Sequence, residues 1–409
     1  MLLAATCLAL VPVDTTLARD NAKIRVLTQN QYLGANLEPL VTASDEVEFN
    51  LAMIGVMQAI GASNYPERVQ ALAQTIMDSR ADLVGMQEMW SFGCIPVSTT
   101  VPNPCSMFGP AFNDHLESTL VALEDIGGGY HVAAVVQNLT IDAPLPGLPV
   151  PGIPVFLDND LLPDIFVTVI DRDVILARDG VEAVPVSYDC LKPSFDGCNY
   201  STVASTSIGD IPLSIERSFV AVDAEVRGRN YRFVNTHLEV RFPDPANPMS
   251  RYIQSLQATE LMGILTVQGA PQGTRTLVVG DFNSDPDDPY PSPGSGPFLT
   301  PYQQLVSGLD WTGTPISAPY HDTWTMQHKP SPGLTCCEAA DLGNETSIHD
   351  RRVDLIFALQ KPAKVKARVL NTQPEDKTAS GLWPSDHASV VARLRFGGKR
   401  RHGHGHYAD

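Results

Sequence analysis

Short apolar runs that end in polar residues recur along the chain, and their spacing predicts β-strands. Residues 24–30 alternate between apolar and polar side chains, as in a strand with one buried face. Residues 83–88 and 277–281 are almost continuously apolar before they reach their polar ends, as in strands buried on both faces. Polar groups at such ends would lie at the rim of a rigid sheet.

A further predicted strand covers residues 231–237 and ends in Asn-Thr-His. Because the side chains of a strand alternate between its two faces, Asn235 and His237 are expected to share one face. Both side chains would then point into the same site.

Two segments have the spacing of helices. From Pro66 to Asp78, apolar residues follow helical periodicity, and Asn64 and Pro66 suit the start of a helix. A second apolar stripe lies between Tyr252 and Val267. We interpret both stripes as faces that pack on a sheet, without a functional role.

Polar clusters that close apolar runs supply complementary chemistry. They contain carboxylates, carboxamides and two imidazoles, which are groups that hold a hard divalent cation and assist hydrolysis of a phosphate ester. One such cluster alone is most often a turn or a helix cap. Their recurrence predicts a shared hydrolytic site, formed by Gln29-Asn30, Gln87-Glu88, Asn235-Thr236-His237, Gly280-Asp281-Phe282-Asn283, Asp354 and Ser385-Asp386-His387.

The ordered set of motifs resembles the endonuclease/exonuclease/phosphatase superfamily, whose members include DNase I, exonuclease III, bacterial sphingomyelinases and inositol polyphosphate phosphatases. The resemblance extends from about Ile24 to Arg395, and the Gly-Asp-Phe-Asn and Ser-Asp-His motifs are its most specific parts. It implies an α/β fold, a four-layered sandwich of two packed mixed β-sheets flanked by helices. It also implies a metal-dependent hydrolase that acts on phosphoric ester bonds.

The same resemblance implies a metal site. Glu88 is similar to the main metal-ligating carboxylate of the family, Asp386 to a second carboxylate near the cation, and Asn30 to a residue beside the metal. Mg²⁺ fits such a site, because it prefers a few oxygen ligands and retains water. Mn²⁺ and Ca²⁺ are the alternatives.

Five further residues resemble the catalytic groups of the family. Asp281 is similar to the residue that positions or deprotonates the attacking water, and Asn283 to the one that orients the phosphate. His237 and His387 resemble the two histidines that contact the scissile phosphate, with Asp354 orienting His387. A carboxylate partner fixes the tautomer of an imidazole and stabilises its protonated form, which can oppose charge on phosphoryl oxygens.

Other charged residues near predicted strands leave alternatives open. Arg217 stands before residues 218–222, where a structural salt bridge and a phosphate contact are both compatible with the sequence. Asp171 and Asp173 are interpreted as strand-entry residues, and Arg178 as an ion-pair partner of either.

The site residues are spread along almost the whole chain of 409 residues. One catalytic domain, residues 23–396, is therefore expected. Residues 1–18 resemble a signal peptide that ends at Thr-Leu-Ala, although the usual basic region is missing. Residues 397–409 are expected to be a flexible, basic, histidine-rich tail; its His402, His404 and His406 are an alternative transition-metal site.

The cysteines agree with export to the cell exterior or the periplasm. Without Cys7 of the signal peptide, six remain, and Cys94 with Cys105 and Cys190 with Cys198 are close enough for local disulfides. The neighbours Cys336 and Cys337 are expected either to pair with a distant cysteine or to remain free. No Cys-x-x-Cys spacing occurs, so the sequence does not predict a metal site built from cysteines.

The net charge of the chain and one insertion, residues 143–157, give indications of the substrate class. The formal net charge of −18 disfavours nonspecific binding of nucleic acid. Residues 143–157 are apolar and proline-rich, and they either cover their own domain or contact a lipid surface. We therefore expect a monomeric phosphodiesterase acting on lipid headgroups or small esters, with no transmembrane segment. The alternatives are an extracellular DNase I-like nuclease and an inactive relative that only binds a partner.

Overall fold

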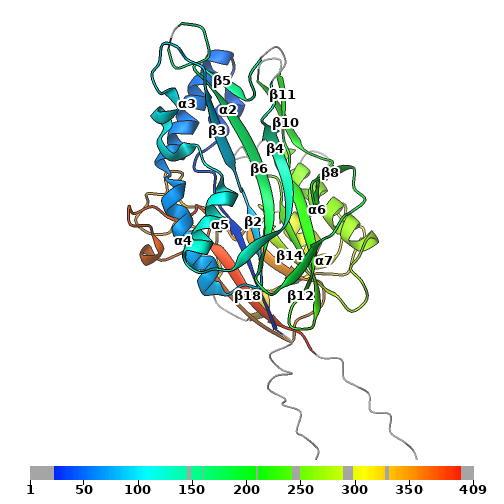
Figure 1. Cartoon of the computed structure of the whole chain (residues 1–409). Helices are drawn as coiled ribbons and strands as arrows, with labels where there is room; N and C mark the ends of the chain where they lie inside the picture. Colours follow the sequence, from blue (N-terminus) through cyan, green and yellow to red (C-terminus); the bar gives the residue numbers. More distant parts are fainter. Residues whose placement is uncertain are drawn as a thin grey trace, which may run out of the picture.

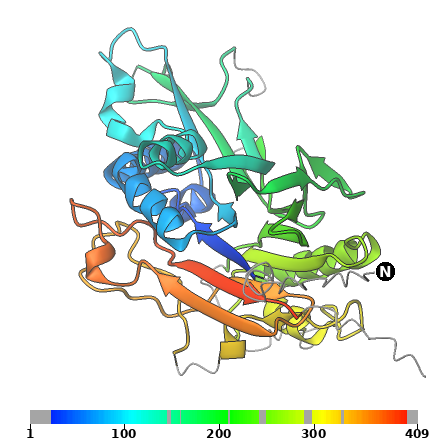
Figure 2. The same cartoon turned by 60° about the horizontal axis from the view of Figure 1, so that its bottom comes forward.

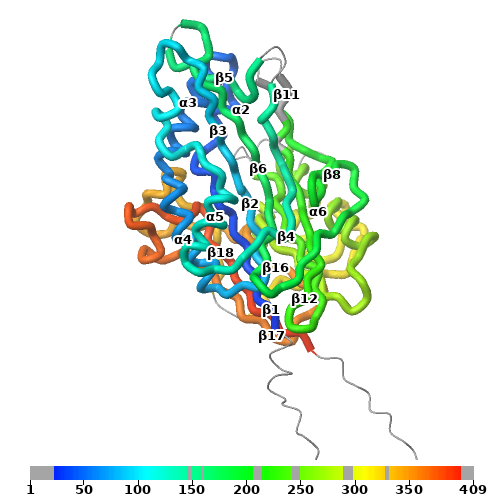
Figure 3. The backbone as a smooth tube through the Cα atoms, viewed as in Figure 1, coloured from blue at the N-terminus to red at the C-terminus, as the bar shows by residue number. Residues whose placement is uncertain are grey.

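The computed structural model describes residues 23–144, 149–158, 160–208, 211–241, 249–288, 298–327 and 331–397. The expected signal peptide and the tail from residue 398 onward lie outside these residues, as do residues 145–148 of the 143–157 insertion. The two ends of the described chain lie side by side, because Lys23 pairs with Arg395 in one sheet (Figure 3).

The first of the two large sheets is mixed. Its central strands β1 and β2 are parallel, whereas their outer neighbours run antiparallel to them. Its eight strands are β17 (Lys364–Leu370), β18 (Ser389–Arg395), β1 (Lys23–Asn30), β2 (Leu83–Gln87), β6 (Ile165–Arg178) and β3 (Ser91–Pro96) in this order, with β4 (Tyr130–Ile141) and β5 (Ile153–Val155) also paired to β6.

The second large sheet has the same kind of centre, because β13 and β14 are parallel and their outer neighbours are antiparallel. A separate hairpin is formed by β10 (Ala204–Ile208) and β11 (Ile211–Ile215). The strands of the second sheet are β15 (His321–Asp322), β16 (Asp354–Ala358), β14 (Arg275–Asp281), β13 (Asn230–His237), β12 (Ser218–Glu225), β9 (Gly197–Asn199) and β8 (Lys192–Ser194), with β7 (Glu182–Pro185) also paired to β12.

Apolar side chains hold four layers together. The inner core joins both sheets, for example Ile24 and Ile175 of the first with Phe233 and Leu277 of the second. Helices cover the outer faces, on opposite sides of the sandwich (Figures 1 and 2). On the first sheet lie α3 (Glu46–Ala62), α4 (Tyr65–Ser79) and α5 (His115–Asp125), and on the second α6 (Met249–Val267) and α7 (Pro301–Ser307); α2 (Glu38–Thr42) precedes α3, and the short 3₁₀ helices are η1 (Pro104–Ala111), η2 (Thr325–Gln327) and η3 (Pro374–Asp376).

This architecture confirms the fold that the motifs implied. The four strands and two helices described above from the sequence are all present as β1, β2, β13, β14, α4 and α6. Helix α3 was not predicted. Val47 and Leu51 of this helix are exposed while Met53 and Met57 are buried, so apolar residues occur on both faces and leave no stripe in the sequence.

The 143–157 insertion packs partly on its own domain. Ile153 and Val155 belong to strand β5 and are buried in the core under α3. Two large apolar side chains are exposed just beyond the insertion, Leu161 and Leu162. Across the described ranges, we find no helix that is both long and apolar enough to cross a membrane.

Candidate active site

The parallel strand pairs bring the motif residues to one rim of the sandwich. Asn30 is aligned with Gln87, the residue before Glu88, and His237 is aligned with Asp281. The two sheets meet there, because the Asn30 Nδ2 atom donates to Asp281 Oδ2 at 3.1 Å and to Glu88 Oε1 at 3.1 Å. Residues far apart in the sequence therefore converge on one site.

His387 and Asp354 form a buried pair at this rim. The Nδ1 atom of His387 lies 2.8 Å from Asp354 Oδ2, which leaves Nε2 facing the site, 3.8 Å from Asp281 Oδ2. Burial alone would lower the pKa of His387, but the carboxylates of Asp354, Asp386 and Asp281 raise it well above its usual range. The imidazole is therefore held in its protonated form.

His237 has the opposite character. Its Nε2 atom lies 3.6 Å from Asp281 Oδ2 and 3.3 Å from the amide nitrogen of Asn283. Burial and the charges of Arg217 and His387 lower the pKa of His237 well below its usual range, so this imidazole is neutral. The two histidines flank Asp281 in different protonation states.

Asp281 lies between these imidazoles. Burial raises its pKa to about 6, against the opposing effect of the His387 charge. Its Oδ1 atom accepts from the backbone N–H of Asn283 at 2.8 Å, and its Oδ2 atom accepts from Asn30. At neutral pH this carboxyl group is mostly ionised and able to accept a proton.

Glu88 and Asp386 provide oxygens suited to a hard cation. The Oδ1 atom of Asp386 is buried and lacks a hydrogen-bond partner among the described residues. Burial raises the pKa of Asp386 to about 7, and the nearby Glu88 charge contributes to this rise. A buried carboxylate oxygen without a hydrogen-bond partner, beside a second carboxylate, fits a bound Mg²⁺ ion. The ion would reduce the repulsion between the two carboxylates.

Asn30 lies beside Glu88 and Asp281 and faces both carboxylates with its NH₂ group. Its amide oxygen accepts from the backbone N–H of Tyr32 at 2.9 Å. In this orientation Asn30 positions Glu88 and Asp281 and does not offer its oxygen to a cation.

The backbone at the site has unusual conformations. Tyr32, Glu88 and Asn283 have φ values of 58°, 59° and 49°, in the left-handed region that residues with a side chain seldom adopt. Gly280 has φ 147°, and a Cβ atom there would lie 1.9 Å from the backbone oxygen of Thr236. The Gly-Asp-Phe-Asn motif therefore needs its glycine so that β13 and β14 can approach each other.

Asn235 does not act with His237 in the site, which corrects the expectation that both side chains point into it. Its NH₂ group donates to the backbone oxygens of Met86 and Val174, and its oxygen accepts from Gln87 Nε2 at 2.5 Å. Gln87 also donates to Thr28 Oγ1 at 3.1 Å. These motif residues form a buried polar link between the two sheets beneath the site.

Two other buried groups fix the loop that carries Asp386 and His387. The Ser385 hydroxyl donates to the backbone oxygen of Asn30 at 2.8 Å and accepts from the His387 N–H at 3.1 Å. The Arg68 guanidinium donates to the backbone oxygens of Gln31 and Pro384, both at 3.0 Å. Arg68 lies on predicted helix α4, yet its isolated position in the sequence gives no signal of this role.

Two further charged side chains lie close to the Nδ1 atom of His237. The Nη1 atom of Arg217 is 3.2 Å from His237 Nδ1, and Asp173 Oδ1 is 4.0 Å from the same nitrogen. Arg217 thus contacts a site histidine and also lies 3.9 Å from Glu239 in an ion pair. The sequence of Arg217 and its neighbours is compatible with both a salt bridge and a phosphate contact.

Asp171 and Asp173 are not strand-entry residues, because they lie in the middle of the long strand β6. Both accept from Asn138 Nδ2 at 3.1 Å, and Asp173 also accepts from Ser218. Arg178 pairs with neither and donates to the backbone oxygen of Arg80. The error arose because two acidic residues inside an apolar run resemble a strand boundary.

All three cysteine pairs are joined. The disulfides Cys94–Cys105 and Cys190–Cys198 agree with the sequence prediction. Cys336 and Cys337 are joined to each other, contrary to the expectation of a distant partner or free thiols.

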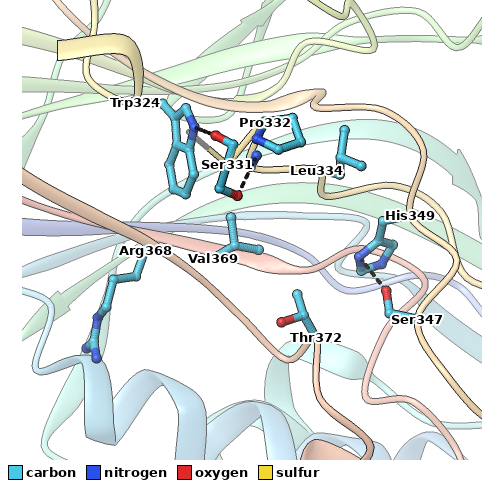
Figure 4. Close-up of a pocket in the computed structure, with 10 residues that line it drawn as sticks. Trp324, Ser331, Pro332, Leu334, Ser347, His349, Arg368, Val369 and Thr372 are labelled. Atoms are coloured by element: carbon cyan, nitrogen blue, oxygen red, sulfur yellow. Dashed lines mark hydrogen bonds between the residues drawn. The ribbon is translucent and has the colours of Figure 1, made fainter. Parts of the chain in front are cut away.

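A pocket of about 410 Å³ borders the site (Figure 4). Trp324 and Leu334 lie on one side of it, Val369 and Thr372 on the other, and His349 at one end. His349 Nε2 is 3.2 Å from the backbone oxygen of Asp386, which connects the pocket wall to the site. The candidate catalytic and metal residues do not contribute to the described lining of this pocket.

No protein-family model matches the chain, and no curated protein matches it in sequence. Among solved structures, it is similar to an endonuclease/exonuclease/phosphatase from Beutenbergia cavernae, with 18% identity, a TM-score of 0.46, and coverage of 92% of this chain and 72% of that chain. It is similar to a mannosyl-6-phosphatase from Bacteroides thetaiotaomicron, with 15% identity, a TM-score of 0.47, and coverage of 91% and 100%. It is also similar to humanized TDP2 from D. rerio, with 12% identity, a TM-score of 0.47, and coverage of 91% and 99%.

Identities and scores of this size carry no activity to the chain. In the order of its motifs and in its two-sheet fold, the chain resembles the endonuclease/exonuclease/phosphatase superfamily.

Proposed function

We propose that this protein is a secreted, Mg²⁺-dependent phosphoesterase that hydrolyses its substrate by attack of an activated water. The observation that supports this most strongly is the pairing of His387 with Asp354 at 2.8 Å, opposite Asp281 and beside Glu88 and Asp386. An acidic metal site, a carboxylate base and a charged imidazole in one place are the groups that phosphate ester hydrolysis requires.

Each residue then has a defined task. Asp281 accepts a proton from the attacking water, because it is ionised at neutral pH and lies between both histidines. His387, kept protonated by Asp354, faces the phosphoryl oxygens with Nε2 and opposes their developing negative charge. Neutral His237 and the NH₂ group of Asn283 orient the phosphate.

Glu88 and Asp386 would hold Mg²⁺, with Asn30 keeping Glu88 in place. Bound there, the ion would supply Lewis-acid polarisation of the phosphoryl group.

For the substrate we favour a phosphodiester of a lipid headgroup or another small ester over DNA. The net charge of −18 repels a polyanion. The densest basic segment of the described chain, with exposed Lys364, Lys366 and Arg368, lies on the edge strand β17. Lys364 is aligned with Arg395, at the end of β18 farthest from His387, so Lys364 lies away from the rim, and Arg368 is the residue of this group that lines the pocket beside the site.

The experiment compares substrates with one enzyme preparation. We expect Mg²⁺-dependent release of product from bis(p-nitrophenyl) phosphate or from sphingomyelin and phosphatidylcholine vesicles, and little nicking of supercoiled plasmid. Fast plasmid nicking that is lost in His387→Ala would replace the lipid proposal with the nuclease. Failure on every phosphoester, with the protein folded and Mg²⁺ present, would instead favour a protein that only binds a partner.

A further inference from the structure

Two adjacent cysteines lie against the catalytic face of His387. The Sγ atom of Cys337 is 3.9 Å from His387 Nε2, the nitrogen that faces the site. Cys336 is bridged through its backbone to both Arg351 and His387, which fixes the pair at this position. The hydrolysis proposed above uses neither cysteine.

His387 is oriented as in a metal site. Because Asp354 binds Nδ1, the Nε2 atom is directed toward the cysteines. Carboxylate–histidine pairs of this kind fix the ring and raise the basicity of the ligating nitrogen in zinc proteins. The ligand atoms of Cys336, Cys337 and His387 all lie within 4.8 Å of one another.

The chemistry of these atoms depends on oxidation state. Joined as a disulfide, as in this structure, the sulfurs carry no charge for a cation. A dithiol reductant would supply two electrons and two protons, giving two thiols while the dithiol becomes a disulfide. Cys337 is partly exposed and so open to such a reductant, and Arg351 Nη2, 3.5 Å from both sulfurs, would favour their thiolate forms.

We propose that Cys336, Cys337 and His387 form a site for a soft divalent cation of the Zn²⁺ class, which opens when the cysteine pair is reduced. Thiolate and imidazole ligands select such an ion over Mg²⁺. Three protein ligands leave the fourth tetrahedral position for water. Binding releases the two thiol protons and the proton of His387 Nε2 to solvent, and the ion then occupies this nitrogen and withdraws it from the phosphoester; this inhibitory part rests on the proposed function.

The binding part is tested with Co²⁺ as a spectroscopic substitute for Zn²⁺. The reduced full chain is expected to bind one Co²⁺ ion with thiolate charge-transfer absorption and the visible bands of a tetrahedral site, which added Zn²⁺ abolishes. The oxidised chain is expected to lack both features. Absence of the thiolate absorption from the reduced, folded chain would overturn the proposal.

The matched control is the double variant Cys336→Ser/Cys337→Ser, treated with the same reductant. It retains the other two cysteine pairs, the acidic pair Glu88 and Asp386, and the histidines of the tail. It is expected to lose the thiolate absorption, whereas Asp354→Asn should retain it with about 10- to 100-fold weaker affinity. Unchanged affinity and spectrum in His387→Ala would show that His387 is not a ligand and would overturn the three-residue site.

The inhibitory part has a separate measurement. Zn²⁺ is expected to inhibit hydrolysis by the reduced chain far more than by the oxidised chain or the double cysteine variant. Equal inhibition of all three would overturn it, because Zn²⁺ would then act elsewhere, for example at Glu88 and Asp386. If no phosphoester is hydrolysed, the Co²⁺ spectra still decide whether the site exists.

Discussion

His387 shows how the site sets the state of one residue through its neighbours. Burial opposes the charge of its imidazole, but three carboxylates reverse that effect, and the nearest of them, Asp354, binds Nδ1 directly. His237, equally buried but beside Arg217, stays neutral. Two identical side chains thus acquire different chemistry from their surroundings.

The role of Asp354 can be tested by replacing its charge while preserving its shape. Asp354→Asn is expected to lower kcat by about 10²- to 10⁴-fold, because His387 loses the partner that keeps it protonated and oriented. Steady-state kinetics on the best phosphodiester provide the measurement. Asp179→Asn, at an exposed acid outside the site, is the control; an unchanged kcat in Asp354→Asn would remove the pair from catalysis.

Asp173 predicts a pH effect on stability. Burial raises its pKa from 3.8 to about 6, so the folded chain binds this proton more tightly than the unfolded chain does. This contribution to the unfolding free energy is fully present below the pKa that Asp173 has in the unfolded chain. It is lost as the pH rises through about 6, and the total loss is about 3 kcal/mol. Because an asparagine at this position carries no ionisable group, the unfolding free energy of Asp173→Asn does not fall for this reason.

Urea unfolding near pH 4 and near pH 7 tests this effect. Relative to wild type, the unfolding free energy of Asp173→Asn should increase by about 2 kcal/mol between about pH 4 and about pH 7. The exposed Glu225→Gln on β12 should show a much smaller change. A constant difference between Asp173→Asn and wild type would mean that Asp173 is ionised throughout.

At the scale of elements, strands were easier to predict than the contacts between them. The two-residue period placed β13 correctly and put Asn235 and His237 on one face. It could not show that the second sheet passes so close to β2 that Asn235 is used as a bridge to Gln87. Sheet-to-sheet contacts are set by packing across the sandwich, which local periodicity does not encode.

The candidate site was predicted to the extent that its residues lie in motifs. Asn30, Glu88, Asp281 and His387 meet at one rim as the motifs implied. Cys337 was not expected there, because it comes from a loop 50 residues before His387 in the sequence and has no metal-ligand spacing of its own. Such contacts depend on the long connections that loops make over the rim.

The close approach of β13 and β14 at Gly280 predicts that one added methyl group destabilises the protein. In Gly280→Ala the new Cβ atom would overlap the backbone oxygen of Thr236, and φ 147° would be strained as well. We expect a loss of about 3 kcal/mol or more in unfolding free energy, together with loss of activity because Asp281 follows directly.

The matched control is Gly55→Ala on α3, where a Cβ atom would meet nothing within 4 Å. Since alanine favours an exposed helix over glycine by about 1 kcal/mol, this variant should be slightly more stable than wild type. Equal stability of Gly280→Ala and Gly55→Ala in urea unfolding would contradict the close contact between β13 and β14.

On the scale of the whole molecule, disulfides secure the regions around the sandwich. Cys94–Cys105 ties strand β3 to helix η1 below α3. The variant Cys94→Ser/Cys105→Ser is expected to lose about 2–4 kcal/mol in unfolding free energy under oxidising conditions. Under reducing conditions the gap between variant and wild type should largely disappear; a gap that persists would assign the effect to packing of the sulfurs.

The whole sandwich serves to bring Glu88 and Asp386 from distant parts of the chain to one metal site beside His387. The most direct test is the rate of phosphodiester hydrolysis with Mg²⁺, with EDTA, and after Mg²⁺ is restored, in wild type, Glu88→Gln and the matched surface variant Glu225→Gln. We predict that EDTA abolishes hydrolysis reversibly, that Glu88→Gln is inactive while folded, and that Glu225→Gln behaves as wild type. Hydrolysis that persists in EDTA, or that is equal in Glu88→Gln and wild type, would contradict a metal-dependent site at this rim.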